Sequence, residues 1–433
     1  MKTIRMPPVI TRRTTMNKNV NYAARAGNSS GGFMVWFMDK LFMGMSLSEY
    51  SRSLITPFNL LAASILATSL PVFISRYGKG LASVLDASNE YPWGLLLSWG
   101  IFAGEPLFAA GFVVASGYYL FGIKSYRPLV RLAVLGGMLG YAFAASYLLI
   151  DLGRPWRIYY PMLINFGPSS VLFVVAWHVA LYVTVQLMEF SPAILEWLGS
   201  KRLHKWAISI TVALIIGGVI LSTVHQSALG AMYLITPGKL HPLWYTSHLP
   251  LLFFSSAVYA AMSFAILLAF AAVRYFRERC DNRFVSSIPT VTLSLGKAAA
   301  VAMYIYFALK VIALAQDDRW GLLLTPLGSW YLVELLGFVA LPMVLFSVAV
   351  KRESIGLIRF SALWAVLGIV LNRVNVNLIA YNWNLPNHWS LIIPSSGEVL
   401  MILAMITLHI LVFRWIMNRF PVTRELSEYK NTH

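Results

Sequence analysis

Ten long runs of apolar residues decide what this chain can become. Each is long enough to cross a bilayer, because about 20 residues of α-helix span the hydrocarbon core. Of the 433 residues, 58% are hydrophobic and 12% are charged, whereas a soluble domain carries about 25% charged residues. The sequence therefore predicts an all-α, polytopic transmembrane helical bundle. The expected spans are 57–75, 92–121, 127–150, 167–190, 203–235, 250–275, 293–315, 327–350, 357–381 and 394–418.

These spans divide the chain into three regions. Residues 1–56 form a basic tail, in which the stretch FMVWFMDKLFMGM (33–45) is too short to cross a membrane and is expected at its interface. Residues 57–420 form the transmembrane domain, and residues 421–433 form a second tail. The first 30 residues lack the apolar core and the small-residue cleavage site of a secretory signal.

The distribution of Lys and Arg predicts how the spans are oriented. Of the 34 basic residues, 26 fall in the tails and loops on one side of the predicted spans, and six fall on the other side. Basic loops stay in the cytoplasm, so both termini are expected to be cytoplasmic, in a bacterial inner membrane. The same rule explains the net charge of +17 without nucleic acid as a partner.

Charged and histidine side chains inside the spans are the candidates for function. A charged side chain in hydrocarbon costs several kcal/mol, so each is expected to have a partner inside the protein. Counting ~1.5 Å per residue from the helix ends places most of them in the half of the membrane away from the basic loops. They are Glu105, Asp151, His178, His225, Lys310, Glu334, Arg373, Glu398 and His409.

The stretch STVHQSALGAM (222–232) puts polar residues into an otherwise apolar span. Ser222, His225 and Leu229 share one helix face, with Gln226 beside them. That face must look into the bundle or a wet cavity. Imidazole titrates near neutral pH, so His225 can donate a hydrogen bond to a carbonyl oxygen or pass a proton. A buried histidine with a purely structural hydrogen bond is an equal alternative.

Two further motifs carry charge at the ends of spans. Asp151 and Arg154 in LLIDLGRPWR either form an ion pair that fixes the helix end or belong to a site. Arg373 in NRVNVN is flanked by asparagines and needs a carboxylate, which Asp151, Glu334 or Glu398 can supply.

Glu105 lies between Gly104 and Pro106, where a helix is expected to kink. A kink frees a backbone carbonyl and admits water, which suits a carboxylate on a proton path. Glu105 and His178 are therefore the candidates for leading protons from the cytoplasm. The alternative is that Glu105 simply pairs with another helix.

The chain is not expected to hold a redox centre of its own. Its single cysteine, Cys280, excludes an intramolecular disulfide, a thiolate zinc site and a cysteine-ligated iron–sulfur cluster within the chain. A b-haem needs facing imidazoles at matched depth, and His178, His225 and His409 are expected at different levels. No metal-ligand spacing, phosphate-binding loop or nucleophile elbow occurs in the sequence. An apolar bundle with a few convergent polar groups suits an apolar ligand with a polar head.

Several of these motifs resemble the NrfD-like family, the polysulfide reductase membrane subunits. The nearest branch is the integral membrane subunit of membrane-bound nickel–iron hydrogenases and of related menaquinone-linked respiratory complexes. The resemblance runs from about residue 55 to 420 and does not cover the basic tail. The motifs that carry it are EYPWGLLLSWGIFAGEPLFAAGF, LLIDLGRPWR, STVHQSALGAMYLI, KLHPLW, LPLLFF and NRVNVNLIAYNW.

The resemblance implies a haem-free subunit built on two four-helix bundles with extra flanking helices. It implies electron exchange between menaquinone and an iron–sulfur partner on the periplasmic side. Quinone-binding residues are implied where motifs match: an Asp-x-Gly-Arg motif, a His-Gln motif and a late-helix arginine. In this branch an acid often follows the PWG motif, where this chain has Gly100, and Glu105, more than one turn later, is the candidate to replace it. The implied quinone-binding residues are Asp151, Arg154, His225, Gln226 and Arg373.

Together these observations predict a quinone-reactive integral membrane subunit of a respiratory oxidoreductase complex, with proton translocation as an added possibility. It would not be active alone. The complex would supply the iron–sulfur subunit and a hydrogenase, molybdopterin or multihaem cytochrome subunit. The alternatives are an ion-coupled secondary transporter, which inward-facing charges and the Gly-Pro kink would suit, and a membrane anchor without a quinone site.

Overall fold

The computed structural model describes residues 33–85, 88, 91, 93–386 and 393–429. The chain divides into two compact units, Met1–Thr56 and Pro57–His433. In the first unit, the described residues form two helices, α2 (Phe33–Leu41) and α3 (Leu47–Ser53). Both are too short to cross a membrane, as the sequence predicts for the stretch 33–45.

The start of α3 is fixed by a reciprocal cap. Ser46 accepts a hydrogen bond from the backbone N–H of Glu49, and the Glu49 carboxylate accepts one from the N–H of Ser46 at 2.9 Å. Two backbone donors that a helix start leaves unpaired are thereby satisfied.

The second unit contains ten helices that are long and apolar enough to span a membrane, counted over the described part of the chain. The predicted all-α polytopic bundle with ten spans is confirmed. The spans are α4 (Pro57–Lys79), α5 to α7 (Leu95–Tyr119), α8 (Arg127–Asp151), α10 (Val171–Leu198), α12 (Thr211–Ala231), α13 (Leu249–Tyr275), α14 (Asn282–Gln316), α15 to α16 (Pro326–Lys351), α17 with η8 (Ile355–Ala380) and α19 (Ser396–Arg419).

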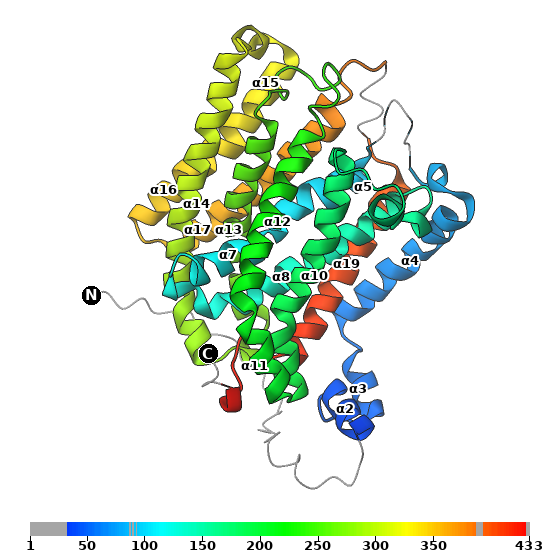
Figure 1. The fold of residues 1–433 in the computed structure, drawn as a ribbon, viewed down its shortest axis with the longest axis vertical. Coiled ribbons are helices and arrows are strands. Elements are labelled where there is room, and N and C mark those ends of the chain that lie inside the picture. The colour runs from blue at the N-terminus through cyan, green and yellow to red at the C-terminus, as the bar shows by residue number, and fades with distance from the viewer. Residues whose placement is uncertain (1–32, 86–87, 89–90, 92, 387–392, 430–433) are drawn as a thin grey trace. The chain divides into compact units, whose positions relative to one another are not determined.

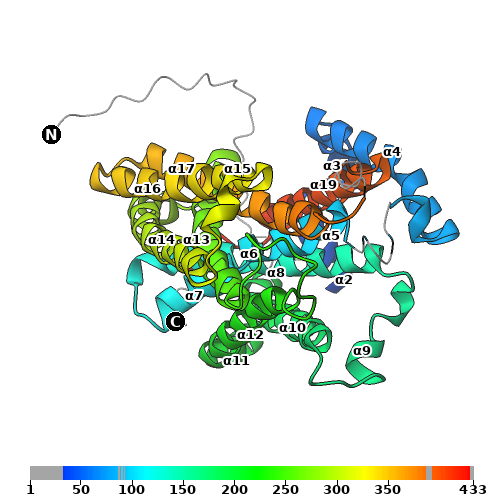
Figure 2. The same cartoon turned by 90° about the horizontal axis from the view of Figure 1, so that it is seen from above.

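Eight of these spans form two four-helix bundles (Figures 1 and 2). In the first bundle α7 packs on α8, α8 on α10, α10 on α12, and α12 back on α7. In the second bundle α13, α14, α16 and α17 form a similar ring. Helix α13 also packs on α6, α7 and α12 and so joins the bundles, while α4 and α19 pack on each other as the flanking pair. This is the arrangement that the family resemblance implies.

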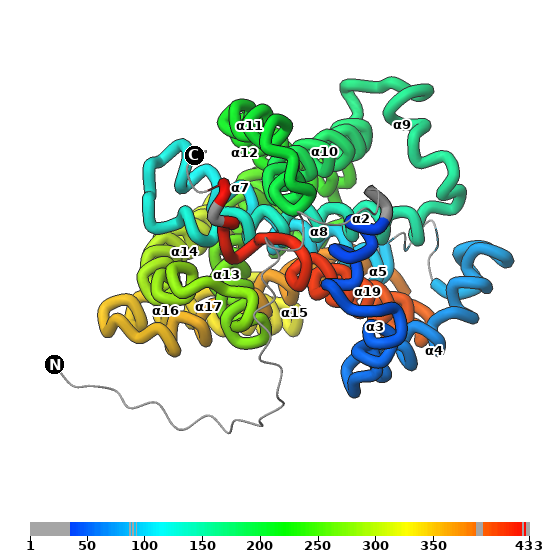
Figure 3. Tube along the Cα trace, turned by 90° about the horizontal axis from the view of Figure 1, so that it is seen from below, coloured from blue at the N-terminus to red at the C-terminus, as the bar shows by residue number. Residues whose placement is uncertain are grey.

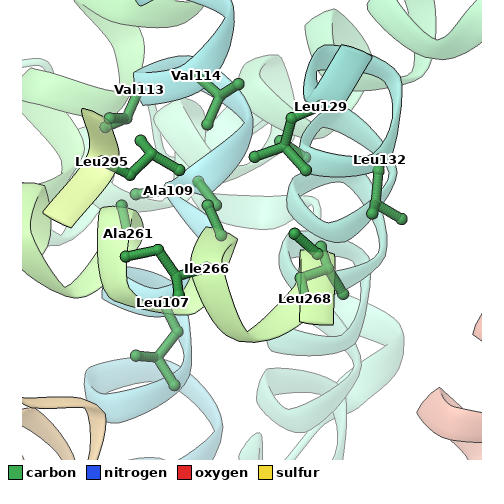
Figure 4. Packing of buried hydrophobic residues seen from close by; sticks show 14 of the residues in the cluster. Leu107, Ala109, Val113, Val114, Leu129, Leu132, Ala261, Ile266, Leu268 and Leu295 are labelled. Carbon is green, nitrogen blue, oxygen red and sulfur yellow. The ribbon is translucent and has the colours of Figure 1, made fainter. Parts of the chain in front are cut away.

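The second span is enclosed by protein. In its most apolar window 83% of the residues are buried, against 11% in α4. The last part of this span is α7, and its apolar side chains pack against those of α8, α13 and α14. Val113, Leu129, Ile266 and Leu295 are among the residues that meet there (Figure 4). A polar side chain on this span therefore faces other helices and not lipid.

Three spans change from α-helical to π-helical winding at polar positions. In the second span, η2 (Ser98–Ala103) lies between α5 (Leu95–Leu97) and α6 (Gly104–Phe108), and α7 (Ala110–Tyr119) follows. A π-helical segment thus ends two residues before Glu105, where the sequence predicts a kink, and the kink itself stays a prediction. Such segments are common at functional sites. The other two are η7 (Val333–Ala340), between α15 (Pro326–Leu332) and α16 (Leu341–Lys351), and η8 (Asn375–Ala380), after α17 (Ile355–Val374).

Some predicted boundaries differ from the structure for local reasons. The fourth span extends to Leu198, not 190, and ends where Gly199 adopts a left-handed conformation (φ 82°). The predicted span 203–235 is divided into the short helix α11 (Lys201–Ser209) and α12. Helix α14 starts eleven residues before 293, because Asp281 caps it by accepting from the N–H of Phe284 at 2.6 Å.

The loops that join spans two and three, four and five, six and seven, and eight and nine lie at the same end of the second unit. We call it the basic end, because the Lys and Arg residues of those loops gather there. Helix α11 lies at this end (Figure 3). The other end is the opposite end.

Candidate functional site

A buried carboxylate and a buried histidine meet inside the first bundle. Glu105 projects from α6 and His225 from α12, and His225 Nε2 is hydrogen-bonded to Glu105 Oε2. Both side chains are at most 1% exposed. We call these two residues the buried pair. The pairing explains how a charged group is accommodated in this span, because a buried charge needs a hydrogen-bonded partner.

Neutral polar side chains surround the buried pair. The ring of Tyr141, on α8, packs edge-on against the His225 ring at a centroid distance of 5.8 Å. Gln226 Nε2 donates a hydrogen bond to the Tyr141 hydroxyl at 3.1 Å. Ser222 and Leu229 are buried on the same side of α12, so the predicted inward orientation of this helix face is confirmed.

A second group of polar residues lies in the second bundle, around the buried carboxylate of Glu334. Glu334 accepts hydrogen bonds from Asn372 at 2.6 Å, Asn375 at 2.7 Å and the Trp244 indole at 3.0 Å. Lys310 Nζ lies 3.6 Å from the same carboxylate. We call these five residues the Glu334 cluster. The Lys310 charge and the three hydrogen bonds together offset the cost of burying the Glu334 carboxylate.

Arg373 lies beside the Glu334 cluster without a direct ion pair to it among the described residues. Its guanidinium donates to Asn372 Oδ1 at 2.6 Å and to Ser256 Oγ at 2.7 Å, and it lies 3.7 Å from the centre of the Phe253 ring. The predicted carboxylate partner is thus reached through Asn372, which contacts both Arg373 and Glu334.

A third group lies at the opposite end of α8, where Asp151 is the last helical residue. No ion pair joins Asp151 to Arg154 in the part of the chain that the structure describes, and Arg154 is exposed. Of the two alternatives left open by the sequence, the helix-end ion pair is therefore wrong. Arg76 of α4 takes its place, donating to the carbonyls of Ile150, at 2.5 Å, and Leu152.

The structure thus brings together some of the expected site residues and separates others. Glu105, His225 and Gln226 form one site with Tyr141, whose role the sequence did not indicate. Asp151 lies ten residues beyond Tyr141 on α8, which is about 15 Å along a helix. Within the described chain, no hydrogen bond or ion pair links Asp151, Arg154 or Arg373 to the buried pair.

The three histidines inside the spans each contact another group of the protein. His178 lies seven residues after the start of α10 and His225 six before the end of α12, so both lie about 10 Å from the same end. The expectation of different levels is wrong for these two. However, His225 Nε2 is bonded to Glu105, and His178 Nδ1 bonds the Val174 carbonyl of its own helix at 2.5 Å. His409 stacks on Phe143 at 4.4 Å.

A large apolar cavity borders the helix that carries Glu105. It has a volume of about 990 Å³ and lies between the second span, α8, α13 and α19. Trp99, Gly100 and Gly104 line it on one side, and His409 and Arg414 line it on the other. Its size and its lining suit a long hydrophobic molecule.

Outside the spans, His241 of the KLHPLW motif anchors the loop before α13. Its backbone N–H donates to the Ala380 carbonyl at 2.8 Å, and its Nδ1 accepts from the N–H of Leu243 at 3.2 Å. Burial, and then the positive charge of Arg319, lower the pKa of His241 from 6.5 to about 4. The folded protein therefore favours the neutral imidazole.

This lowered pKa predicts a pH-dependent stability. The contribution of His241 is fully present above pH 6.5 and is lost as the pH falls toward 4, because the unfolded chain binds the proton more tightly. We expect the melting temperature of the detergent-solubilised protein to fall across this window. The melting temperature of a His241→Asn variant, whose side chain does not titrate in this window, should fall by less. An equal fall in both proteins would contradict the assignment.

These features define a multi-pass membrane protein that encloses paired charges within two helix bundles. The chain belongs to the NrfD family, whose model, described as "Polysulphide reductase, NrfD", matches residues 83–382. The resemblance seen in the sequence is thereby confirmed.

Three relatives cover most of the chain. A protein of Nitratidesulfovibrio vulgaris (strain Hildenborough) is 41% identical over 395 residues, covering 90% of this chain and 100% of the relative. The "Probable Ni/Fe-hydrogenase 2 b-type cytochrome subunit" of Escherichia coli (strain K12) is 28% identical, and the match covers 82% of this chain and 90% of the relative. The "Menaquinone reductase, integral membrane subunit" of Nitratidesulfovibrio vulgaris is 27% identical, and the match covers 73% of this chain and 79% of the relative.

Proposed function

We propose that this chain is the quinone-reactive membrane subunit of a respiratory complex, exchanging electrons between menaquinone and an iron–sulfur partner subunit. Membership of the NrfD family supports this proposal. So do the names of two relatives, a menaquinone reductase subunit and a hydrogenase subunit. The observation that carries the proposal is the buried pair with its polar neighbours, because quinone chemistry needs proton-exchanging groups shielded from water.

The electrons must come from or go to another subunit. With one cysteine, the chain cannot supply the thiolates of an iron–sulfur cluster. The partner would hold such a cluster and would be joined by a hydrogenase, molybdopterin or multihaem cytochrome subunit. By the positive-inside rule the basic end is cytoplasmic, so the partner would dock on the periplasmic, opposite end of a bacterial inner membrane.

The buried pair suits the proton part of the reaction. Menaquinone takes two electrons from the partner and two protons to become menaquinol, and the reverse reaction releases them. His225 Nε2 is held by Glu105, while Nδ1 is buried without a hydrogen-bond partner among the described residues. We assign to His225 a hydrogen bond to a quinone oxygen and the transfer of its proton, with Gln226 as a second donor.

The 990 Å³ cavity suits the isoprenoid chain of the quinone. It reaches Gly104, the residue next to Glu105, so a quinone in this cavity would approach the helix that carries the pair. The quinone-binding roles of Asp151, Arg154 and Arg373 stay predictions, because these residues lie in other groups. Asp151 and Arg154 lie at the opposite end, where they would face the partner subunit.

The test is a His225→Asn variant of the intact complex. We expect it to assemble normally but to reduce a menaquinone analogue at a rate lowered roughly 10²-fold, the lower end of what a positioned proton-transfer group contributes. His248→Asn is the matched control, because His248 hydrogen-bonds Thr246 and Ser247 in the loop before α13.

The same preparation separates the alternatives. An assembled His225→Asn complex with full quinone turnover would reject the role of this side chain. A wild-type complex that never reduces quinone would favour the anchor. Solute movement by the purified chain alone in liposomes would favour the transporter.

A further inference from the structure

A row of polar side chains leads from the buried pair toward the basic end, inside the first bundle. Gln226 donates to the Tyr141 hydroxyl at 3.1 Å, and the Tyr141 ring packs on the Tyr182 ring at 4.3 Å. Gln186 Nε2 then donates to the Tyr182 hydroxyl at 3.0 Å and to Glu189 Oε2 at 3.0 Å. We call these five residues the polar row. They come from α8, α10 and α12, so only the folded bundle aligns them.

The polar row and the adjoining His225 hold several buried polar atoms without protein partners. Gln186 Oε1, Glu189 Oε1, Gln226 Oε1 and His225 Nδ1 are all buried without a hydrogen-bond partner among the described residues. Leaving such a group unpaired destabilises the folded protein. Neighbouring buried polar atoms without protein partners are where internal water molecules bind. A purely structural row would satisfy these atoms within the protein.

Glycines on three neighbouring helices make room for the row. A Cβ atom added at Gly111 or Gly137 would lie 2.9 or 2.7 Å from Gln186 Oε1. A Cβ atom at Gly218 would lie 3.1 Å from Glu189 Oε1. Helices α7, α8 and α12 thus approach the polar atoms of α10 with bare backbone, where a larger residue would fill the space.

The far end of the row reaches a cavity that opens at the basic end. Glu189 lines a cavity of about 50 Å³ together with Tyr119, Arg131 and Thr211. The same three residues also line a cavity of about 520 Å³, whose wall includes Arg127 and loop residues of the basic end. The two cavities also share Val130 and Ile208, so they adjoin one another.

We propose that the polar row is a water-containing proton path between the basic end and the buried pair, with Glu189 as its proton-accepting group. This proposal rests on the proposed quinone function. The Glu189 carboxylate takes a proton from water in the cavity and passes it to water held by Gln186. The Tyr182 and Tyr141 hydroxyls each accept one proton and release another toward the buried pair. Each row residue ends as it began, and the proton ends on the quinone that the partner's electrons reduce.

This path replaces His178 as the route expected from sequence. His178 bonds the carbonyl of Val174 in its own helix. No side-chain hydrogen bond, ion pair or ring contact among the described residues connects it to the polar row. Glu105 keeps its expected place, at the inner end of the path.

The first test compares variants of the intact complex in proteoliposomes. Glu189→Gln is expected to lower the rate of quinone reduction at least 10-fold without changing the KM for the quinone analogue, and Glu189→Asp to restore part of the rate. His178→Asn should keep the wild-type rate. Thr184→Val is the matched control, because Thr184 is an exposed residue of α10 whose hydroxyl bonds only its own helix. A Glu189→Gln complex at the wild-type rate, or a slow His178→Asn complex beside it, would overturn the path.

A second measurement needs no quinone. In acidified D₂O the Glu189 carboxylate takes up a deuteron and becomes a carboxyl. In the purified protein the infrared band of this buried, deuterated carboxyl should appear within the mixing time, and it should be missing in Glu189→Gln. Gln186→Leu, which interrupts the row beyond Glu189, should leave that band in place. If Glu189→Gln removes no exchanging band, the path is wrong, whether or not the wild-type complex reduces quinone. Failure of quinone reduction by the wild-type complex would instead reject the proposed function.

Discussion

A Glu105→Gln complex should assemble and yet lose nearly all quinone turnover, with the rate lowered roughly 10³-fold. Glu105 contacts His225 directly and lies where the proposed proton path meets the quinone site. A positioned acid or base contributes about 10²–10⁴-fold. Glutamine keeps the shape and one hydrogen bond to His225 but cannot take or release a proton. The measurement is the steady-state rate of quinone reduction per assembled complex.

Two controls make this result interpretable. Glu278→Gln removes a carboxylate from an exposed loop and should leave the rate unchanged. Glu105→Asp restores a carboxylate with a shorter side chain and should recover part of the rate. Should Glu105→Gln turn over quinone like the wild type, neither the quinone site nor the inner end of the proton path lies at the buried pair.

The spans were predictable because their signal is local. A run of about 20 apolar residues has one stable solution in lipid, so ten helices could be counted from the sequence. The existence of two four-helix bundles was implied only by the family resemblance. Which helices form each bundle was not predicted, because apolar faces in lipid carry little directional information. The partner of His225 could not be predicted from the sequence either, because Glu105 lies 120 positions away in the chain.

The missed residues show where sequence reasoning failed. With the fourth span expected to end at 190, Glu189 would be an ordinary acid near a helix end. Because α10 continues to Leu198, Glu189 lies nine residues, or about 14 Å, inside the helix. The longer apolar run beyond residue 190 was the available signal.

The error at Asp151 has a different cause. Close spacing suggested an ion pair with Arg154, but α8 ends at Asp151 and Leu152 adopts an extended conformation. The chain therefore turns away before Arg154. Arg76, counted as a loop residue on the sequence, is instead buried against this helix end.

The largest effect on folding should follow from Glu334→Leu. This change removes the single carboxylate of the Glu334 cluster and leaves Lys310 as a buried cation without an ion-pair partner among the described residues, with Arg373 nearby. Removing one member of a buried ion pair costs about 3–5 kcal/mol. Asn372, Asn375 and the Trp244 indole would also lose their acceptor. We expect little folded protein in membranes and a sharply lowered melting temperature in detergent.

Combining a Glu334 variant with Lys310→Met separates charge from packing. Glu334→Gln keeps an acceptor for part of the hydrogen bonds. It still leaves the Lys310 cation without its carboxylate partner, so this variant should also be less stable than the wild type. Lys310→Met removes that cation, and the double variant should be more stable than Glu334→Gln alone. A double-mutant cycle measures this coupling directly. If the two changes simply add, or Glu334→Leu melts like the wild type, the cluster is not held together by charge, and Arg373 is stabilised by Ser256 and the Phe253 ring alone.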